Sequence, residues 1–159
     1  MAIALRPVPG QDEEFMRMAL EEARRAEEEG EVPVGAVLVS GGKVIGRGRN
    51  RPIGLCDPTA HAELLAIREG AGNVRNYRLP ETTLFVTLEP CAMCAGALLQ
   101  ARVRRLVFGA EDSRAGAVRS LFGLLADDRL NHRVEITSGV LEDECREILQ
   151  RFFRERREK

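Results

Sequence analysis

The middle of this chain constrains its fold most, because an apolar strand, an apolar helix and a second apolar strand follow one another there. Residues 83–88 and 106–109 are short runs of β-branched and other apolar side chains, and both are predicted strands. Residues 91–101 between them are apolar almost throughout, which predicts a helix that meets the sheet on one face and needs a second cover, such as another subunit, on the other. Strands joined by a helical crossover lie parallel in one sheet, so this segment predicts an α/β fold.

The flanking segments extend this unit into a larger sheet. Apolar residues at three- and four-residue spacing predict an amphipathic helix over 12–29, capped by Asp12 and ended by Gly30. Residues 110–132 are expected to form a long, partly helical connection. The remaining predicted elements are strands at 34–39, 44–49 and 134–138, helices at 60–70 and 142–157, and a hairpin turn at 40–43. This order predicts a sheet with helices on both faces.

Size and composition indicate a globular protein. A length of 159 residues predicts one domain over 1–159, with 1–10 as a candidate disordered segment. No apolar run reaches the roughly 18 residues needed to span a membrane, and the first ten residues lack a signal-peptide pattern. Two of the four cysteines form a Cys-x-x-Cys, which indicates metal or redox chemistry rather than a disulfide framework. We therefore expect a cytoplasmic protein that does not enter a membrane.

The charge is nearly balanced overall but unevenly distributed. The formal net charge is −1, yet residues 11–31 hold nine acidic residues and three arginines. Residues 43–54 hold four basic residues and no acid, and residues 150–159 hold five basic residues and two acids. Local basic surface can bind a polyanion even at a net charge near zero. The charge pattern by itself is equally compatible with an ordinary mixed-charge surface.

A histidine and two cysteines form a candidate metal site. Cys91 and Cys94 are three residues apart, so one helical turn places both sulfurs on the same side. Pro90 suits the start of that helix, and a helix N-terminus favours the thiolate form that binds metal. His61, near the start of another predicted helix, can supply a third ligand. Zinc prefers thiolate and imidazole ligands of this kind.

No fourth protein ligand is evident. His132 lies in a turn far along the sequence, and Cys56 lies in a loop. Three protein ligands and one open position describe a catalytic zinc site that holds water, and zinc lowers the pKa of that water to roughly 7. Glu63, two residues after His61, is placed to move protons beside the metal as a general acid and base.

Other interpretations of these motifs differ in how much they explain. A Cys-x-x-Cys alone would favour a structural zinc or a redox pair, and a His-x-Glu alone is weaker still. Together, in this order and with Pro90 before the first cysteine, they match the zinc-deaminase signature. A redox pair would leave His61 and Glu63 unexplained. Cys56 and Cys145 are expected to be plain buried cysteines without a functional role.

At these residues and over nearly its whole length, the sequence resembles the bacterial tRNA-specific adenosine deaminases of the cytidine-deaminase superfamily. The zinc motif would fit any member of the superfamily. The loop at Asn50, the Asn-His-Arg turn at 131–133 and the Phe-Phe-Arg tail at 152–154 favour the tRNA branch. The segments that carry the resemblance are 32–37, 50–53, 57–63, 86–97, 107–110, 116–121, 130–133 and 152–154.

The resemblance implies a fold, a reaction and a set of site residues. The fold would be a three-layer α/β/α sandwich with a mixed five-stranded sheet, and the active form would be a homodimer. The substrate would be the wobble adenosine of a tRNA anticodon loop, converted to inosine by zinc-bound hydroxide, with one zinc per subunit. Zinc would be held by His61, Cys91 and Cys94, with Glu63 moving protons. Substrate contacts would come from Asn50, Ala62, Pro90, Asp112, Arg114 and Phe153.

One departure from the family and two rival functions stay open at this point. Family members often have Lys followed by Thr or Gly where this chain has Arg114 and Ala115, which keeps the positive charge but changes the local RNA contact. Phe152 or Phe153 could stack on a base, and the alternative is that both are core residues. The first rival function is a free nucleobase or nucleoside deaminase acting on guanine or cytosine. The second is a non-catalytic, zinc-stabilised RNA-binding module.

Overall fold

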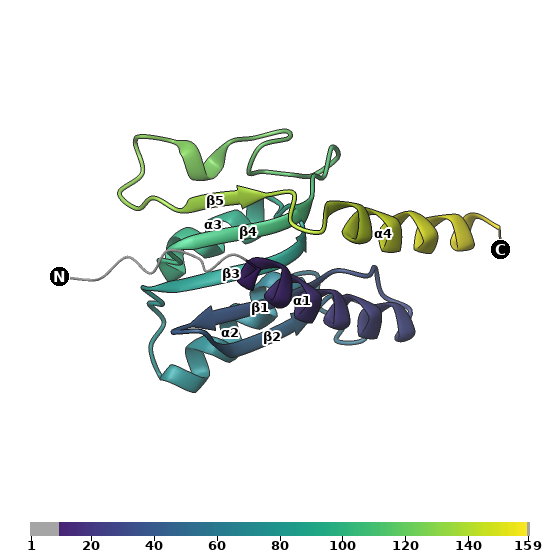
Figure 1. The fold of residues 1–159 in the computed structure, drawn as a ribbon, viewed down its shortest axis with the longest axis horizontal. Coiled ribbons are helices and arrows are strands. Elements are labelled where there is room, and N and C mark those ends of the chain that lie inside the picture. The colour runs from purple at the N-terminus through teal and green to yellow at the C-terminus, as the bar shows by residue number, and fades with distance from the viewer. Residues whose placement is uncertain (1–9, 159) are drawn as a thin grey trace.

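The computed structural model describes residues 10–158 as a mixed five-stranded sheet between two layers of helices (Figure 1). The elements are α1 (Gln11–Glu28), β1 (Gly35–Ser40), β2 (Lys43–Arg49), α2 (Ala62–Val74), β3 (Thr82–Leu88), α3 (Ala92–Ala101), β4 (Arg105–Ala110), η1 (Leu124–Ala126), β5 (Glu135–Ser138) and α4 (Glu142–Arg157). This arrangement confirms the predicted three-layer α/β/α fold. The candidate disordered segment falls, except for Gly10, outside the described residues.

The sheet has the strand order β2-β1-β3-β4-β5. β1 pairs antiparallel with both β2 and β3, while β3 and β4, and β4 and β5, pair parallel. The predicted parallel pair on either side of the crossover helix is therefore confirmed. The predicted hairpin is confirmed as well, with Gly41 and Gly42 at φ of 57° and 79°, values that glycine adopts without strain.

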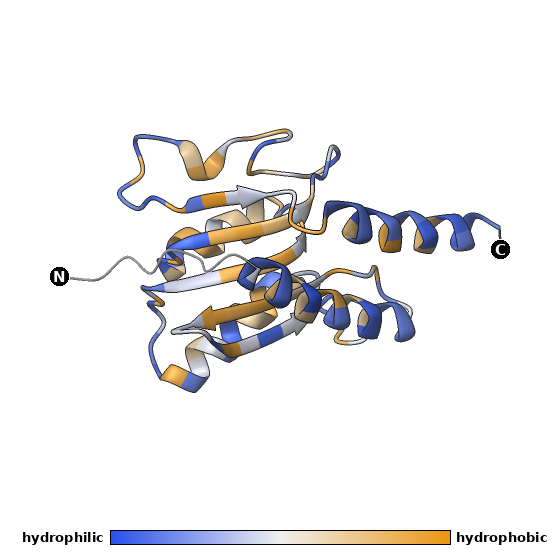
Figure 2. Ribbon diagram, viewed as in Figure 1, coloured by the Kyte–Doolittle hydropathy of each residue, from blue (hydrophilic) through white to orange (hydrophobic). Residues whose placement is uncertain are grey.

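The two faces of the sheet carry separate hydrophobic clusters. Leu38 and Leu84 face α2 and α3, whereas Val37 and Phe85 face α1 and α4. The central strands are therefore buried on both faces. Their sequences are nearly continuous apolar runs, as is usual for strands of parallel sheets in α/β proteins. Figure 2 shows β1 largely in orange and α4 largely in blue. No helix within residues 10–158 is both long and apolar enough to cross a membrane.

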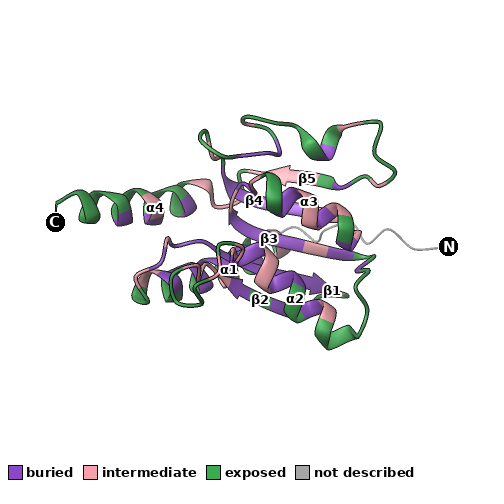
Figure 3. Cartoon of the chain, turned by 180° about the vertical axis from the view of Figure 1, so that it is seen from behind, coloured by how far each residue is buried: buried purple, intermediate pink, exposed green. Residues whose placement is uncertain are grey.

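Two glycines of β2 allow α2 to lie directly against the sheet. A Cβ at Gly48 would come within 2.1 Å of the Ala62 carbonyl oxygen, and one at Gly46 within 2.2 Å of the Ala66 carbonyl oxygen. Any larger residue would push α2 away from β2. This close approach sets the position of the start of α2, where His61 and Glu63 lie. Figure 3 shows α2 and α3 side by side over the buried strands on this face.

Two local expectations were wrong, and a third was confirmed only in small part. α2 continues past Gly70 to Val74, because Gly70 makes room for the Leu38 side chain instead of ending the helix. Asp12 does not cap α1; it forms two hydrogen bonds with Arg105 on β4, and Gly10 takes the cap position without a side-chain bond. The connection at 110–132 contains only one short 3-10 helix, and side-chain hydrogen bonds hold its first half instead.

Candidate active site

The three predicted metal ligands meet at the starts of two helices on the same face of the sheet. His61 immediately precedes α2, Cys91 immediately precedes α3, and Cys94 lies in the first turn of α3. His61 Nδ1 lies 3.7 Å from Cys91 Sγ and 3.6 Å from Cys94 Sγ. All three ligand atoms lie within 4.8 Å of one another. Segments 30 residues apart in the sequence thus form one compact donor set.

This donor set fits zinc. A tetrahedral zinc with Zn–S of about 2.3 Å and Zn–N of about 2.0 Å places nitrogen and sulfur about 3.5 Å apart. The observed 3.6 and 3.7 Å match that separation. Within residues 10–158 no other group of three potential ligands gathers in this way. Neither Cys56 nor His132 belongs to this group, and His132 is hydrogen-bonded to the Val103 carbonyl oxygen. The expectation that Cys56 is buried was wrong, because it lies in an exposed loop, whereas Cys145 is buried as expected.

The two thiols are hydrogen-bonded to each other, and their pKa values are shifted in opposite directions. The pKa of Cys91 is lowered to about 3, chiefly by hydrogen bonding to Cys94 and then to His61. The pKa of Cys94 is raised, because of its hydrogen bond to Cys91 and because of burial. The hydrogen bond to Cys91 also raises the pKa of His61. An anionic sulfur beside an imidazole is a suitable starting point for binding a cation, since thiolates are the ligand form.

Glu63 is buried beside these ligands. It lies in the first turn of α2 and is only 4% exposed. Burial raises its pKa, although its own backbone N–H and the neighbouring Cys94 and His61 act in the opposite direction. A buried carboxyl group with a raised pKa is suited to take up and release a proton during a reaction. The position predicted for a general acid and base is therefore occupied by a suitable group.

Asn50 connects the end of β2 to the start of α2. Its Oδ1 accepts a hydrogen bond from the backbone N–H of Ala62 at 3.0 Å. Neither His61 nor Cys91, the residues at the cap positions of their helices, makes a side-chain cap bond. Asn50 therefore supplies the cap that α2 lacks locally, and does so from 12 residues away. This contact fixes the residue that lies between His61 and Glu63.

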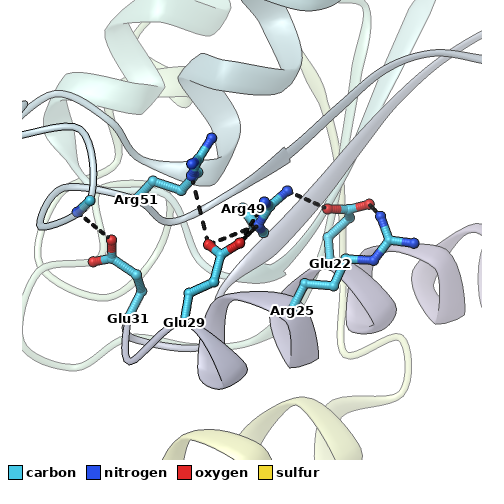
Figure 4. A network of polar contacts seen from close by, with 7 residues as sticks. Glu22, Arg25, Glu29, Glu31, Arg49 and Arg51 are labelled. Carbon is cyan, nitrogen blue, oxygen red and sulfur yellow. Dashed lines mark hydrogen bonds and ion pairs between the residues drawn. The ribbon is translucent and has the colours of Figure 1, made fainter.

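An ion-pair network holds the chain on either side of Asn50 (Figure 4). Arg49 pairs with Glu29 at 2.6 Å and with the buried Glu22 at 3.7 Å, and Arg51 pairs with Glu29 at 3.7 Å. Glu31 is 2% exposed and accepts the backbone N–H groups of Ile53 and Gly54. The acidic and basic segments seen in the sequence therefore neutralise each other in part.

This network shows that part of the basic run at 43–54 is not free to bind a polyanion. Arg49 and Arg51 belong to the basic run at 43–54, but their guanidinium groups are engaged by glutamates of the chain's own acidic segment. Sequence reasoning did not single out Glu31 or Glu22, because an acidic run gives no sign of which carboxylates will be buried. Glu89, which directly precedes Pro90 and is 2% exposed, was not singled out either, because nothing in an otherwise apolar sequence marks a lone glutamate as buried.

The six predicted substrate-contact residues fall into two groups. Ala62 and Pro90 each adjoin a predicted metal ligand in the chain, and Asn50 is hydrogen-bonded to Ala62. The Pro90 carbonyl oxygen accepts the N–H of Ala117 at 2.9 Å. Asp112, Arg114 and Phe153 line one groove between α4 and the segment after β4. The arginines of that groove are Arg114, Arg146, Arg154, Arg156 and Arg157. The structure thus gathers the second group around a basic surface with an aromatic ring.

Comparisons with known proteins identify the family. The profile of the MafB19-like deaminases matches residues 10–157. The tRNA-specific adenosine deaminase of Haemophilus influenzae is 56% identical over 148 residues, covering 92% of this chain and 86% of the relative. That of Bacillus subtilis is 50% identical, covering 94% and 92%. The chain belongs to the tRNA-specific adenosine deaminase family. It is therefore an enzyme of the deaminase class.

Solved structures agree with this membership. A structure from studies of A-to-I editing by tRNA:A34 deaminases at the wobble position of transfer RNA superimposes with a TM-score of 0.83 at 48% identity. The match covers 86% of this deaminase and 99% of that chain. The guanine deaminase of Bacillus subtilis matches with a TM-score of 0.60 at 38% identity, over 62% and 64% of the two chains. Membership of this family favours catalysis over the non-catalytic RNA-binding alternative.

Proposed function

We propose that this deaminase hydrolyses adenosine to inosine at the wobble position of a tRNA anticodon. The observation that carries the proposal is the 56% identity with a tRNA-specific adenosine deaminase over 92% of this chain. The gathering of His61, Cys91 and Cys94 beside a buried carboxylate supports the chemical part of it. A domain spanning 1–159 and a cytoplasmic location stay predictions from the sequence.

Zinc, one per chain, would be held by His61 Nδ1 and the sulfurs of Cys91 and Cys94, and when bound it would activate a water molecule as the nucleophile. Glu63 takes a proton from that water and delivers it to N1 of adenine as the oxygen attacks C6. Glu63 then takes the remaining proton of the new C6 hydroxyl group and delivers it to the amine, so that the C6–N6 bond breaks and the C6 carbonyl forms. One water is consumed, one ammonia is released, and the base becomes hypoxanthine.

The target base must leave its stack to reach the buried Glu63. A base in an anticodon loop is unpaired and flips out at lower cost than a paired one. In our proposal the side-chain amide of Asn50 binds the inserted nucleoside, while its Oδ1 keeps the bond to Ala62. Ala62 and Pro90 flank the base, since each directly adjoins a metal ligand in the chain.

The groove between α4 and residues 110–114 would bind the RNA beside the target base. Phe153 is 46% exposed there and presents a ring on which a neighbouring base can stack. Arg114 and the arginines of α4 can contact phosphates. Asp112 accepts the backbone N–H groups of Arg114 and Ala115, which shapes the loop that carries Arg114.

A homodimer is the assembly we propose. α3 was expected to need a cover on its outer side, and Met93 on that helix is 37% exposed. The connection after β4 carries further exposed apolar residues, namely Leu121, Phe122, Leu124 and Leu130. A second copy would remove this apolar surface from water. Light scattering at micromolar concentration should give twice the chain mass, and Phe122→Glu should shift the protein toward monomer.

Guanine deamination is the second candidate, because of the 38% identity to a guanine deaminase over 62% of this chain. The deciding experiment incubates zinc-loaded enzyme with three substrates in parallel: an anticodon stem-loop with a wobble adenosine, free guanine and free cytidine. A stem-loop with guanosine at the same position is the control. We expect inosine and equimolar ammonia from the first stem-loop only. Ammonia from guanine or cytidine with an inert stem-loop would overturn the proposal in favour of the rival.

A further inference from the structure

Glu89 is a buried carboxylate that the deamination mechanism does not use. It lies between β3 and α3, two residues before Cys91, and is 2% exposed. Its own N–H donates to the Ala110 carbonyl oxygen at 2.8 Å, which holds it beside the end of β4. Burying a carboxylate costs free energy unless donors surround it. The partners of Glu89 therefore indicate what it does.

All five donors to the Glu89 carboxylate come from residues 112–120. Oε1 accepts the N–H of Asp112 at 3.1 Å and the hydroxyl of Ser120 at 2.5 Å. Oε2 accepts the N–H groups of Val118, Arg119 and Ser120 at 3.1, 2.8 and 3.0 Å. Hydrogen bonds to an ionised acceptor are about twice as strong as those between neutral groups. One side chain thus satisfies four backbone donors of a segment that contains neither helix nor strand.

Gly116 closes the segment around this carboxylate. A Cβ at Gly116 would come within 2.4 Å of Glu89 Cδ and 2.5 Å of the Asp112 carbonyl oxygen, so no other residue fits without displacement. The next residue, Ala117, donates its N–H to the Pro90 carbonyl oxygen. The loop therefore wraps around residues 89–90 and is tied to both the side chain of one and the backbone of the other.

The same contacts join two parts of the active site. On one side, Glu89 and Pro90 lead directly into Cys91 and the start of α3, which carries both thiols. On the other side, the loop carries Asp112 and Arg114, which line the basic groove. Among the hydrogen bonds of the described residues, only those to the Glu89 carboxylate and the Pro90–Ala117 bond tie residues 112–120 to the segment that begins α3, while Ala117 and Val118 also pack in the same hydrophobic cluster as Ala95 and Leu98.

We propose that Glu89 is a positioning residue, which fixes the RNA-facing loop 112–120 relative to the thiol-bearing start of α3. RNA affinity depends on it more than the chemical step does, because the loop carries groove residues and no proton-transfer group. This inference deepens the proposed function and rests on it for the identity of the RNA. The positioning itself can be tested without any RNA.

The first test measures amide hydrogen exchange by NMR in Glu89→Gln. The new amide group turns N–H donors toward the N–H groups of the loop. We expect exchange at Val118, Arg119 and Ser120 to accelerate by at least about tenfold, with the amides of α3 unchanged. Unchanged exchange in the loop, or equal acceleration throughout the protein, would overturn the proposal.

Two milder variants keep the test decisive if Glu89→Gln does not fold. Ser120→Ala removes one donor and leaves the carboxylate, and Gly116→Ala displaces the loop from the other side. Both should accelerate exchange at the same amides, Ser120→Ala by less. Glu81→Gln, at an exposed carboxylate far from the loop, is the matched control and should leave these amides unaffected.

The second test measures kinetics on the anticodon stem-loop. For Glu89→Gln we expect one zinc per chain, a KM raised at least about tenfold and a kcat within about threefold of the parent. A fall in kcat with unchanged KM, or loss of zinc, would contradict a positioning role toward RNA. If the parent enzyme itself leaves the stem-loop unchanged, the proposed function fails, while the exchange experiment still decides the role of Glu89.

Discussion

Asn50 accepts the backbone N–H of Ala62 through its Oδ1, at 3.0 Å, and so holds the start of α2 between His61 and Glu63. The side-chain amide has a second functional group, the NH₂, which is the donor that a bound nucleoside would use. One residue thus combines a structural contact with a proposed substrate contact. The two roles can be separated because they use different atoms.

Asn50→Asp retains an oxygen for Ala62 but loses the NH₂, whereas Asn50→Ala loses both. We expect Asn50→Ala to lower the free energy of unfolding by about 1 kcal/mol, as loss of a helix cap does, and Asn50→Asp to leave it unchanged. Both variants should lose at least about tenfold in kcat/KM on the stem-loop. Urea unfolding and steady-state kinetics provide the measurements. A fully active Asn50→Asp enzyme would exclude the substrate contact.

Phe152 and Phe153 provide a matched pair, since they are adjacent but differently placed. Phe152 is 6% exposed and packs under the Arg156 guanidinium, while Phe153 is 46% exposed in the groove. Phe152→Ala should lower the free energy of unfolding by about 3 kcal/mol. Phe153→Ala should leave stability nearly unchanged and weaken stem-loop binding by about tenfold, through loss of stacking. The reverse pattern would show that the groove does not bind RNA.

Glu31 and Glu29 lie close together in the chain but differ in burial. We therefore expect their substitutions to lower the free energy of unfolding by different amounts. Glu31 is 2% exposed and holds the N–H groups of Ile53 and Gly54, whereas the Glu29 side chain is 39% exposed in its pair with Arg49. Glu31→Gln should lower the free energy of unfolding by about 1–3 kcal/mol, since the backbone N–H groups lose a charged acceptor and the new NH₂ group meets one of them. Glu29→Gln should cost less, because water and salt screen its ion pair. Equal costs in urea unfolding would contradict this account.

Because of the buried Cys145 thiol, we expect the protein to lose stability at high pH. Burial, and then the nearby Glu144, raises the pKa of its thiol to about 12. The folded protein keeps the thiol protonated at pH values where the unfolded chain, with an ordinary pKa near 9, has lost the proton. Stability from this group is therefore complete below pH 9 and declines as the pH rises toward 12.

The measurement is urea unfolding at several pH values from 8 to 10.5, for the parent and for Cys145→Ala. The variant has a lower stability throughout because it leaves a cavity, but it should lose stability less steeply above pH 9. Parallel curves for the two proteins would show that the Cys145 thiol does not titrate differently on folding.

The parts of the fold that follow from local pattern were predictable. The predicted helix at 142–157 matches α4, because apolar residues such as Cys145 and Ile148 recur on one face and Gly139 precedes it. The crossover helix and its parallel strands were predictable because their residues are apolar on all sides. The end of α2 was not predictable, since Gly70 acts through its contact with Leu38, which the sequence alone does not contain.

The candidate metal ligands of the site were predictable from the sequence, but the buried glutamates that hold the surrounding loops were not. The grouping of His61, Cys91 and Cys94 follows from two helix starts with distinctive residue types, and the structure brings these atoms together. Glu31 and Glu89 were not predictable, because a glutamate in the sequence looks the same whether it is solvated or buried among backbone donors. Metal binding and the RNA contacts of the six substrate residues stay predictions.

The central claim is that Glu63 moves protons in a zinc-dependent deamination, and Glu63→Gln tests it most directly. The measurement is inosine formed in an anticodon stem-loop by this variant, on samples shown to carry one zinc per chain. Glutamine keeps the size of the side chain but cannot exchange a proton in the same way. We expect inosine formation to fall by at least about 10²–10⁴-fold with zinc retained. Inosine formation at the parent rate by the zinc-loaded variant would contradict the account.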